Sequence, residues 1–379
     1  MTDTSTASPI AWPSPQRREA FEQWLAPLAA AYRLDLKSLR PASADASFRR
    51  YLRLDGGGDA SGGHGGDRVS DHASDGATSS AGSGAETSFI VMDAPPPQED
   101  VRPFVHIAGL IHDAELHAPQ VLAQDVEHGF LLLSDLGSRL YLDALREAAA
   151  PQADALMRDA IQALVRWQLR IKADTLPRYD EQLLRRELAL FPDWCVAHEF
   201  KLHWSVVQRA TWERICGLLV QSALAQPMVA VHRDWMPRNL MVAEPNPGIL
   251  DFQDAVLGPL SYDVASMLRD AFISWEEASE IDWAARYWDA ARQAALPVPE
   301  DFGEFWRQLE WMGLQRHLKV LGIFCRLKHR DGKPKYTQDL PRFFAYATKV
   351  ALRYRDLQPL VALLEPMSGL TRETAYSMR

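Results

Sequence analysis

The sequence contains few cysteines: Cys195, Cys216 and Cys325 are the only three among 379 residues. They are widely spaced and form no C-x-x-C pair, so a disulfide framework is not expected and a zinc site built on cysteines is nearly excluded. Long apolar stretches are missing as well, since no uninterrupted run approaches the roughly 20 residues that span a bilayer. The N-terminus lacks the basic and apolar segments of a signal peptide. These absences favour a cytoplasmic protein with reduced thiols.

The chain also has fewer basic than acidic residues. The chain has 41 Lys and Arg against 50 Asp and Glu, a formal net charge of −9. Broad binding to nucleic acid or to an anionic membrane rewards a basic surface, so neither partner is expected. Apolar residues make up 47% of the chain, enough to bury a sizeable core in one large two-lobed unit or in two domains. No obligate protein partner is evident.

The composition changes along the chain in a way that indicates its organisation. Residues 1–15, rich in Ser, Thr and Pro, are expected to be a flexible leader. Residues 16–134 contain helical patterns and several strand-like runs, which predict a small N-terminal lobe with an antiparallel sheet. Residues 135–379 are dominated by helical patterns and predict a larger, mainly helical C-terminal lobe. The expected helices are 141–149, 151–172, 180–199, 206–224, 261–274, 280–294, 301–328 and 339–363. The expected fold class is therefore α+β.

One segment of the N-terminal lobe differs from the rest in composition. Residues 56–88 are rich in Gly and Ser and almost devoid of large apolar side chains. Such a segment cannot offset its ordering entropy by burial, so it is expected to be disordered. Strand-like runs flank it at 48–54 and 88–92. We interpret it as a long insertion in a hairpin connection, because the cost of closing a loop grows only slowly with its length.

The most informative stretch is 231–242, which reads V-H-R-D-W-M-P-R-N-L-M-V. It contains H-R-D-x-x-x-x-N, the pattern of kinase catalytic loops. In that pattern a carboxylate accepts the proton of an attacking hydroxyl, and an amide oxygen one short loop away holds a metal ion. Asp234 suits the first role and Asn239 the second, while His232 is expected to brace the loop by hydrogen bonding.

A second acidic motif follows shortly after Asn239. Residues 248–254 read G-I-L-D-F-Q-D, and the intervening Ala-Glu-Pro-Asn-Pro-Gly is a turn that predicts a hairpin. Such a hairpin brings Asp251 back beside Asn239, and a carboxylate with an amide oxygen suits Mg²⁺. Asp254 either assists the metal or caps the segment that follows.

These motifs carry a resemblance to a known family. Residues 228–270 resemble the aminoglycoside phosphotransferase family, whose fold is similar to that of protein kinases. The whole chain is similar to one branch, the kinases that phosphorylate N-acetylmuramate and N-acetylglucosamine at the anomeric C1 hydroxyl in bacterial cell-wall recycling. Besides the catalytic-loop run, the segments that carry the resemblance are SADASFRRY (43–51), MDAPP (92–96), GFLLLSDLG (129–137), LDFQDAVLGPLSYDVASMLRD (250–270) and LQRHLKVLGIFCRL (314–327). The resemblance implies a protein-kinase-like bilobal fold, ATP and Mg²⁺ as cofactors, and an amino sugar as small-molecule substrate.

The resemblance also implies which residues contact the nucleotide. The loop from Ser43 to Arg50 would lie over the ATP phosphates, and residues 133–136 would be the hinge that contacts adenine through backbone groups. The residues implied are Ser43, Ser47, Arg49, Arg50, Ser134, Asp135 and Leu136. The sequence departs from the kinase pattern at 89–93, a strand without the usual lysine for the α- and β-phosphates.

Candidate substrate residues come from the C-terminal lobe. N-acetylmuramate carries a carboxylate, and a protein of net charge −9 needs locally placed cations to bind it. Arg316 and Lys319 share one face of the helix expected at 301–328, with His317 beside them. The alternative is an ordinary solvated charged face. Trp235 either stacks on a sugar face or wedges the two lobes.

Two other functions remain open at this point. A kinase for choline, ethanolamine or an aminoglycoside needs carboxylates or aromatic side chains around its cationic substrate. A nucleotide-binding regulator without catalysis would account for the missing lysine, but it leaves Asp234, Asn239 and Asp251 unexplained.

Overall fold

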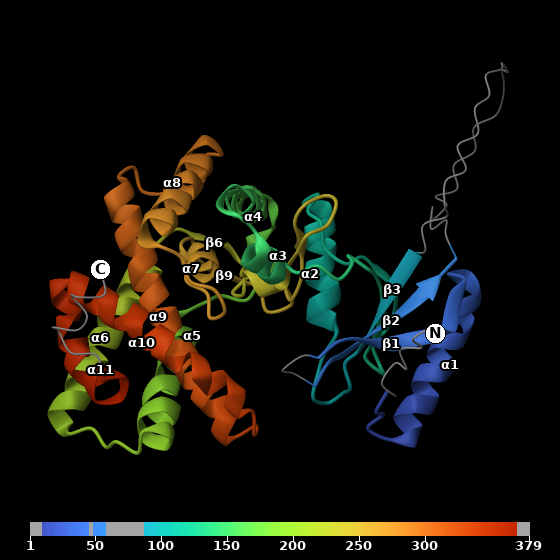
Figure 1. The fold of residues 1–379 in the computed structure, drawn as a ribbon, viewed down its shortest axis with the longest axis horizontal. Helices are drawn as coiled ribbons and strands as arrows, with labels where there is room; N and C mark the ends of the chain where they lie inside the picture. The colour runs from blue at the N-terminus through green and yellow to red at the C-terminus, as the bar shows by residue number, and fades with distance from the viewer. Residues whose placement is uncertain (1–9, 45–47, 58–86, 370–379) are drawn as a thin grey trace. The chain divides into compact units, whose positions relative to one another are not determined.

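The computed structural model describes residues 10–44, 48–57 and 87–369. Contacts within the chain divide it into two units, the first formed by residues 1–108 and 119–136 and the second by residues 109–118 and 137–379. The first unit contains the larger sheet and the second most of the helices (Figure 1).

The first unit is built on a five-stranded antiparallel sheet with the strand order β1-β2-β3-β5-β4. The strands are β1 Leu34–Ala44, β2 Arg50–Gly56, β3 Thr87–Asp93, β4 Val121–Asp125 and β5 Phe130–Ser134. Strands β2 and β3 pair from Arg50 opposite Asp93 to Gly56 opposite Thr87, which confirms the predicted hairpin. Most of the Gly/Ser-rich insertion, residues 58–86, lies outside the described residues. The sequence pattern does not predict β1 and β4, because both are edge strands that carry mixed polar residues.

The core of the first unit lies between helix α1 (Pro15–Ala31) and one face of the sheet. The side chain of Ser14 caps the helix by accepting a hydrogen bond from the backbone N–H of Arg17 at 3.1 Å. Phe21 and Leu25 turn inward and are buried. They join a cluster with Leu34, Leu52, Leu54, Phe89, Val91, Phe130 and Leu132. Burial of each such side chain stabilises the fold by about 1.5–3 kcal/mol, so this cluster fixes which face of the sheet is covered.

Part of the expected leader contacts this core. Residues 1–9 lie outside the described residues, but Trp12 packs against Phe21 with ring centroids 4.8 Å apart.

The second unit is mainly helical. Helix α2 (Arg102–Asp113) begins in the first unit and ends in the second. The other α-helices are α3 Tyr141–Glu147, α4 Ala150–Arg170, α5 Glu181–Leu190, α6 Val206–Leu224, α7 Tyr262–Leu268, α8 Glu277–Gln293, α9 Phe302–His329, α10 Leu340–Arg353 and α11 Val361–Ser368. Four short strands form two antiparallel pairs, β6 Met228–Val231 with β9 Val256–Pro259 and β7 Leu240–Met241 with β8 Gly248–Ile249. Within the part of the chain that the structure describes, no helix has the length and apolarity needed to cross a membrane.

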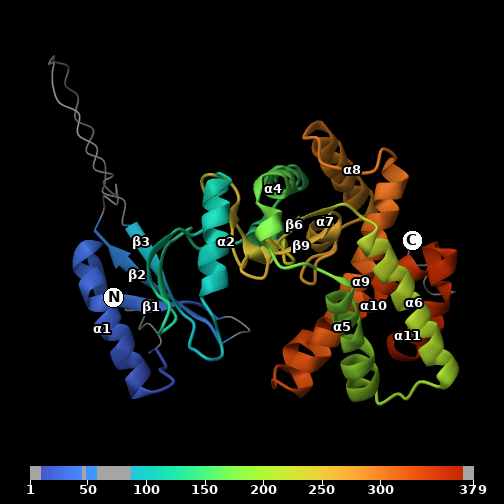
Figure 2. The ribbon, with the colours of Figure 1, turned by 180° about the vertical axis from the view of Figure 1, so that it is seen from behind.

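Helix α9 is the central helix of this unit. It packs against α5, α6, α7, α8 and α10, and Figure 2 shows it among them. Gly322 permits its close approach to the end of α5, because a Cβ atom at this position would lie 2.4 Å from the carbonyl carbon of Leu190.

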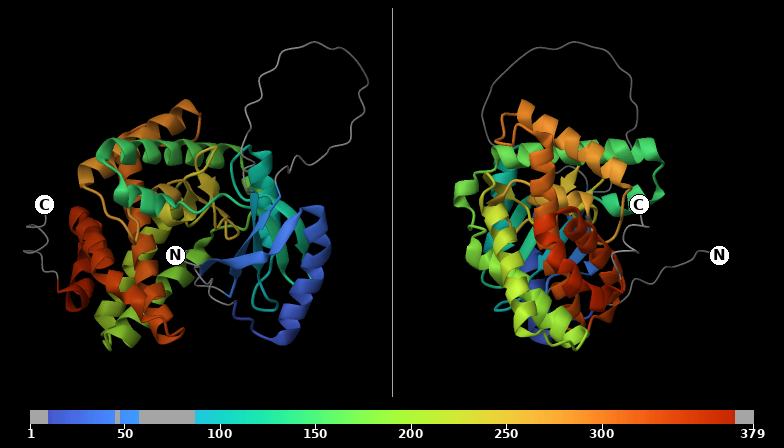
Figure 3. Two further views of the ribbon diagram at one scale, coloured as in Figure 1. Left: turned by 45° about the vertical axis from the view of Figure 1, so that its right-hand side comes forward. Right: turned by 90° about the vertical axis from the view of Figure 1, so that its left-hand side faces the viewer.

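Helix α4 supports the strand that leads into the candidate site. It lies beside α8 (Figure 3) and also packs on β6. The buried Trp167 donates a hydrogen bond from its indole N–H to the carbonyl oxygen of Ala230 at 3.1 Å. This contact fixes β6 two residues before the H-R-D motif.

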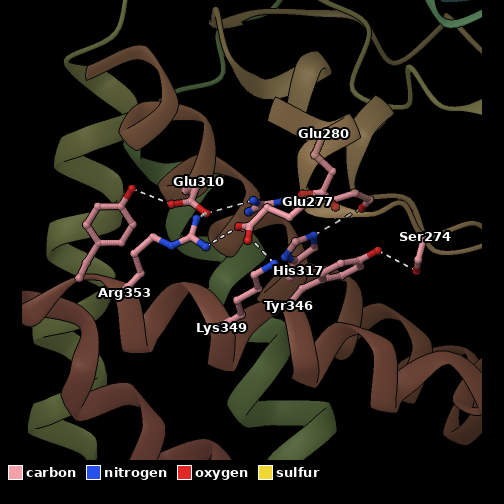
Figure 4. A network of polar contacts seen from close by, with 10 residues as sticks. Ser274, Glu277, Glu280, Glu310, His317, Tyr346, Lys349 and Arg353 are labelled. Carbon is pink, nitrogen blue, oxygen red and sulfur yellow. Dashed lines mark hydrogen bonds and ion pairs between the residues drawn. The ribbon is translucent and has the colours of Figure 1, made fainter. Parts of the chain in front are cut away.

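An ion-pair network joins helices α8, α9 and α10 of the second unit to the residue that follows α7 (Figure 4). Arg269, just after α7, is buried and pairs with Glu280 of α8 at 3.2 Å and with Glu310 of α9 at 3.0 Å. Arg353 of α10 also pairs with Glu310, at 2.5 Å, and with Glu277 of α8. Because these charges are paired, the large cost of an uncompensated buried charge is avoided.

Three predicted helices are shorter than the sequence pattern suggests. The helix expected at 180–199 ends at Leu190 and continues as a π-helix, Phe191–Glu199, where Pro192 lacks the N–H that an α-helix needs. The helix expected at 339–363 is divided by a 3₁₀ segment, Arg355–Leu360. The one expected at 261–274 ends at Leu268.

Candidate active site

The H-R-D loop begins where β6 ends and is held by a buried carboxylate from α7. Asp263 accepts hydrogen bonds from the backbone N–H of His232 at 2.7 Å and of Arg233 at 3.0 Å. Arg233 adopts a φ of 76°, a left-handed conformation that costs a non-glycine residue about 1 kcal/mol or more. Burial raises the pKa of Asp263 to about 7, while its two backbone donors act in the opposite direction. The two hydrogen bonds offset the strain and fix the start of the loop.

His232 connects this loop to the second acidic motif. Its Nε2 lies 3.0 Å from the carbonyl oxygen of Leu250, and its Nδ1 lies 3.3 Å from the backbone nitrogen of Asp234. A carbonyl oxygen only accepts, so Nε2 carries the proton and Nδ1 accepts from Asp234. Burial lowers the pKa of His232 to about 4, which keeps the ring neutral near pH 7. The ring therefore braces both loops by hydrogen bonding, as the sequence predicts.

The three residues singled out by the motifs meet at one place. The predicted β7–β8 hairpin forms, and the backbone N–H of Leu250 donates to the carbonyl oxygen of Asn239 at 2.9 Å. The amide nitrogen of Asn239 donates to the carbonyl oxygen of Asp234 at 3.0 Å and lies 3.5 Å from Oδ2 of Asp251. Asp251 has a φ of 60°, a second left-handed residue in the site. The Asp234 side chain is 43% exposed, so its carboxylate is accessible to a ligand.

A polar cluster lies behind the loop. Glu187 of α5 is buried and accepts from Arg233 at 2.6 Å, and it pairs with Lys319 of α9 at 3.0 Å. Tyr179 donates to the same carboxylate. Burial alone would raise the pKa of Glu187, but Lys319 and Arg233 hold it below its ordinary value. The cluster anchors the Arg233 side chain and places positive charge near Asp234.

A second buried cation lies closer to the candidate base. The side chain of Arg316 on α9 is buried, and its Nη2 lies 3.9 Å from Oδ1 of Asp234. Asp270, which follows α7, is fully buried and accepts from the backbone N–H of Ala271 at 2.5 Å. Burial raises the pKa of Asp270 to about 6, although the nearby Arg316 acts to lower it.

The other three predicted substrate residues contact residues other than Asp234. Trp235 is fully buried and packs against Trp167, with ring centroids 5.9 Å apart. His317 is buried and stacks on Tyr346, with ring centroids 5.0 Å apart. Lys319 is directed to Glu187 and to the hydroxyl of Tyr262, at 3.1 Å. Within the described part of the chain, Arg316 is the one of these four residues with an ion-pair contact to Asp234. Contact of any of the four with a substrate stays a prediction.

The predicted phosphate contacts belong to the first unit. Ser43 lies in β1, opposite Tyr51, and Ser47 lies outside the described residues. Arg49 pairs with Glu99 at 3.0 Å. Arg50 pairs with Asp93, and its guanidinium lies 4.7 Å from the centroid of the Trp12 ring. Both arginines therefore already have partners in this unit.

The predicted hinge, residues 133–136, comprises the last two residues of β5 and the two that follow. The side chain of Ser134 accepts from the backbone N–H of Gln120 at 2.8 Å. Asp135 pairs with Arg53 at 2.6 Å and accepts from Ser88 at 2.7 Å. Leu136 is half-buried. These contacts fix the side chains and leave the assignment of adenine contacts to backbone groups as a prediction.

Sequence reasoning missed three residues that organise the site. Asp263 and Asp270 lie inside the 250–270 run that carries the family resemblance, but a single Asp in a helical pattern has no chemical signature of its own. Glu187 lies far from the motifs in sequence. The one available signal is that helical periodicity places this charged residue on the buried face of its helix.

The site offers few protein ligands for a metal ion. Among residues 10–44, 48–57 and 87–369, no group of three or more His, Cys, Asp or Glu side chains is placed to hold one. Mg²⁺ at a nucleotide does not require such a group, because it uses one or two protein ligands together with phosphate oxygens and water. Asn239 and Asp251, with end groups 3.5 Å apart, offer one amide and one carboxylate. Turning the amide of Asn239 presents its oxygen, so the two residues fit a Mg²⁺ ion.

Comparison with known proteins identifies the family. The model of the phosphotransferase enzyme family matches residues 72–305. The chain belongs to this family. The predicted resemblance to phosphotransferases is therefore confirmed.

Two relatives of this phosphotransferase cover most of its length. The N-acetylmuramate/N-acetylglucosamine kinase of Pseudomonas putida is 48% identical over 88% of this chain and 90% of the relative. The protein of the same name from Pseudomonas aeruginosa is 50% identical over 86% of this chain and 87% of the relative.

A solved structure supports the fold. The ethanolamine kinase of Plasmodium vivax matches with a TM-score of 0.56 and 12% sequence identity, over 89% of each chain. At this identity the likeness concerns the fold alone. The predicted α+β, protein-kinase-like fold is confirmed.

Proposed function

We propose that this phosphotransferase transfers a phosphoryl group from ATP to the anomeric C1 hydroxyl of N-acetylmuramate, of N-acetylglucosamine, or of both, as part of peptidoglycan recycling. The names of the two Pseudomonas relatives support the amino-sugar acceptor. The observation that carries the proposal is the convergence of Asp234, Asn239 and Asp251 in the second unit.

Asp234 is the proposed catalytic base. Its backbone is fixed by His232 and Asn239, while its carboxylate is accessible. It would orient the anomeric hydroxyl and accept its proton as the bond to phosphorus forms. An anomeric hydroxyl is more acidic than other sugar hydroxyls, which reduces the demand on the base. Because the transition state of phosphoryl transfer is loose, most of the acceleration comes from alignment and charge neutralisation.

Asn239 and Asp251 would hold Mg²⁺ together with phosphate oxygens of ATP, and the ion would neutralise charge on the phosphates. The left-handed conformation at Asp251 and the hairpin hydrogen bond at Leu250 fix the direction of this carboxylate. Nucleotide contacts from the first unit, at Ser43, Ser47, Arg49, Arg50 and residues 134–136, remain part of the proposal.

Charge around Asp234 argues against a cationic acceptor. Arg316 lies 3.9 Å from its carboxylate, and Lys319 lies near enough to interact with it electrostatically. Choline, ethanolamine and aminoglycosides are cations, which Arg316 would repel, whereas Lys319 is already paired with Glu187. A regulator without catalysis would have no need of the accessible Asp234 carboxylate.

A coupled assay of ADP release tests the function. Purified protein is supplied with Mg²⁺, ATP and one of four acceptors: N-acetylmuramate, N-acetylglucosamine, choline or kanamycin. We expect turnover with one or both amino sugars and with neither of the other acceptors, and phosphorus NMR of the product should show a phosphate on C1. Turnover with choline or kanamycin alone, or with no acceptor, would contradict the proposal.

A further inference from the structure

Two buried charged side chains beside the candidate base have hydrogen-bonding capacity that the protein does not use. Nη1 of Arg316 and Oδ2 of Asp270 are both buried, and neither has a hydrogen-bond partner within the described part of the chain. Arg316 is 3% exposed and Asp270 is fully buried. A buried charged group without a partner is costly, so such atoms normally meet a protein group, a water or a ligand.

The positive charge of Arg316 acts on the carboxyl group of Asp270. The two nevertheless form no direct ion pair among the described residues, where the ion pair of Arg316 is with Asp234. The guanidinium thus has one carboxylate on the Asp234 side and a second in its vicinity. A small polar group that meets Nη1 of Arg316 and Oδ2 of Asp270 would give both atoms the partner they lack.

Residues adjacent in sequence to Arg316 and Asp270 connect the backbone at these two positions. His317, next to Arg316, directs its Nε2 to the carbonyl oxygen of Arg269, next to Asp270, at 3.4 Å. Arg269 is itself paired with Glu280 and Glu310. The positions of Arg316 and Asp270 are therefore fixed before any ligand binds, which lowers the entropy cost of binding.

The chemistry of the pair selects one kind of ligand group. Nη1 of Arg316 requires an acceptor, and the ionised Oδ2 of Asp270 requires a donor. A hydroxyl group is both. A carboxylate only accepts and leaves Asp270 without a donor, and an ammonium group only donates and leaves Arg316 without an acceptor. A neutral sugar hydroxyl meets both requirements.

We propose that Arg316 and Asp270 together bind one hydroxyl of the acceptor sugar, at C4 or C6. This inference rests on the proposed function, in which the C1 hydroxyl lies at Asp234. C4 and C6 carry free hydroxyls in both amino sugars, whereas the lactyl ether of N-acetylmuramate replaces the hydroxyl at C3. Arg316 therefore supports both substrates equally and does not read the carboxylate of N-acetylmuramate.

The test is a cycle that combines protein variants with deoxy sugars. Wild type, Asp270→Asn and Arg316→Gln are assayed by kcat/KM with N-acetylmuramate, N-acetylglucosamine and the 4-deoxy and 6-deoxy forms of N-acetylglucosamine. The exposed pair Asp282 and Arg286 of α8, 2.6 Å apart, supplies the matched controls Asp282→Asn and Arg286→Gln. Thermal unfolding of every variant, and calorimetric binding of N-acetylglucosamine, separate loss of fold from loss of contact.

We expect each site variant to lower kcat/KM by about 10- to 100-fold for both amino sugars, as for a hydrogen bond to a charged group. With one of the two deoxy sugars, kcat/KM of wild type should fall by a similar factor relative to N-acetylglucosamine. The same deoxy sugar should lower kcat/KM of the site variants by about threefold or less. The controls should match wild type.

Three results would overturn the inference. In the first, each deoxy sugar lowers kcat/KM by the same factor in wild type and in the variants. This is the result expected if a buried water, and not a sugar hydroxyl, bridges Arg316 and Asp270. In the second, Arg316→Gln impairs N-acetylmuramate alone. In the third, folded variants keep wild-type kcat/KM. Failure of the proposed function is a separate result, since wild type itself would then phosphorylate neither amino sugar.

Discussion

At the scale of single residues, Asp234 is positioned through its backbone. The carboxylate of Asp263 binds the backbone N–H groups of the two residues that precede Asp234. The ring of His232 accepts a hydrogen bond from the N–H of Asp234, and the amide of Asn239 donates one to the carbonyl oxygen of Asp234. These contacts leave the Asp234 carboxylate free to meet a hydroxyl. A neutral His232 is essential to this arrangement, because a protonated ring has no acceptor to offer the Asp234 N–H.

The buried carboxyl of Asp270 makes stability depend on pH. Burial raises its pKa to about 6, so the folded state binds the proton more tightly than the unfolded chain. The stabilisation is complete below the ordinary pKa of an aspartate and is lost as pH rises through about 6. We expect the free energy of unfolding of wild type, relative to Asp270→Asn, to fall by roughly 1–3 kcal/mol from about pH 4 to about pH 7.

Urea denaturation of both proteins across this range measures the effect. A difference between wild type and Asp270→Asn that stays constant across this range would show that the Asp270 carboxyl does not titrate in this way.

At the scale of elements, close packing of α9 against α5 positions the cations of the site. Arg316 and Lys319 lie on α9, and Glu187, which binds Lys319, lies on α5. Gly322 sets the distance between the two helices, because a Cβ there would overlap the backbone of Leu190. Gly313, on the same helix, has room for a Cβ, with its nearest neighbour at 3.6 Å.

This contrast gives a matched pair of substitutions. Gly322→Ala should destabilise the protein by about 1–3 kcal/mol, since the backbone must shift to relieve the overlap. Gly313→Ala should be neutral or stabilising by up to about 1 kcal/mol, because Ala favours the helix. Chemical denaturation measures both. Equal effects of the two substitutions would show that α9 and α5 are not in close contact at Gly322.

The sequence predicts elements and motifs well and packing poorly, for physical reasons. Periodicity predicts α6 and α9 almost to the residue, and the turn at 243–248 predicts the hairpin that brings Asp251 to Asn239. The edge strands β1 and β4 lack the apolar alternation that would have indicated them. The burial of His317 and the direction of Lys319 toward Glu187 depend on contacts distant in sequence, which a local pattern does not contain.

At the scale of the whole molecule, the proposed reaction draws on both units. The predicted nucleotide contacts belong to the first unit, and the proposed base and metal ligands to the second. The Gly/Ser-rich insertion interrupts the sheet of the first unit between β2 and β3, yet the strands pair fully up to Gly56 and Thr87.

Because this pairing is complete, the sheet should not need the insertion. Replacing residues 58–86 by a short Asn-Gly turn should change the melting temperature and the affinity for ATP only slightly. Thermal unfolding and calorimetry with ATP measure the two quantities. A collapse in ATP affinity at an unchanged melting temperature would instead assign the insertion a role in covering the phosphates.

The most direct test of the account is the turnover of Asp234→Asn with Mg²⁺, ATP and N-acetylglucosamine or N-acetylmuramate, whichever wild type prefers. The substitution keeps the size of the side chain and removes its ability to accept the proton. We expect kcat to fall by at least about 10²-fold, while ATP still binds by calorimetry and the melting temperature stays close to that of wild type. Near-wild-type turnover in the folded variant would contradict the assignment of Asp234 as the catalytic base.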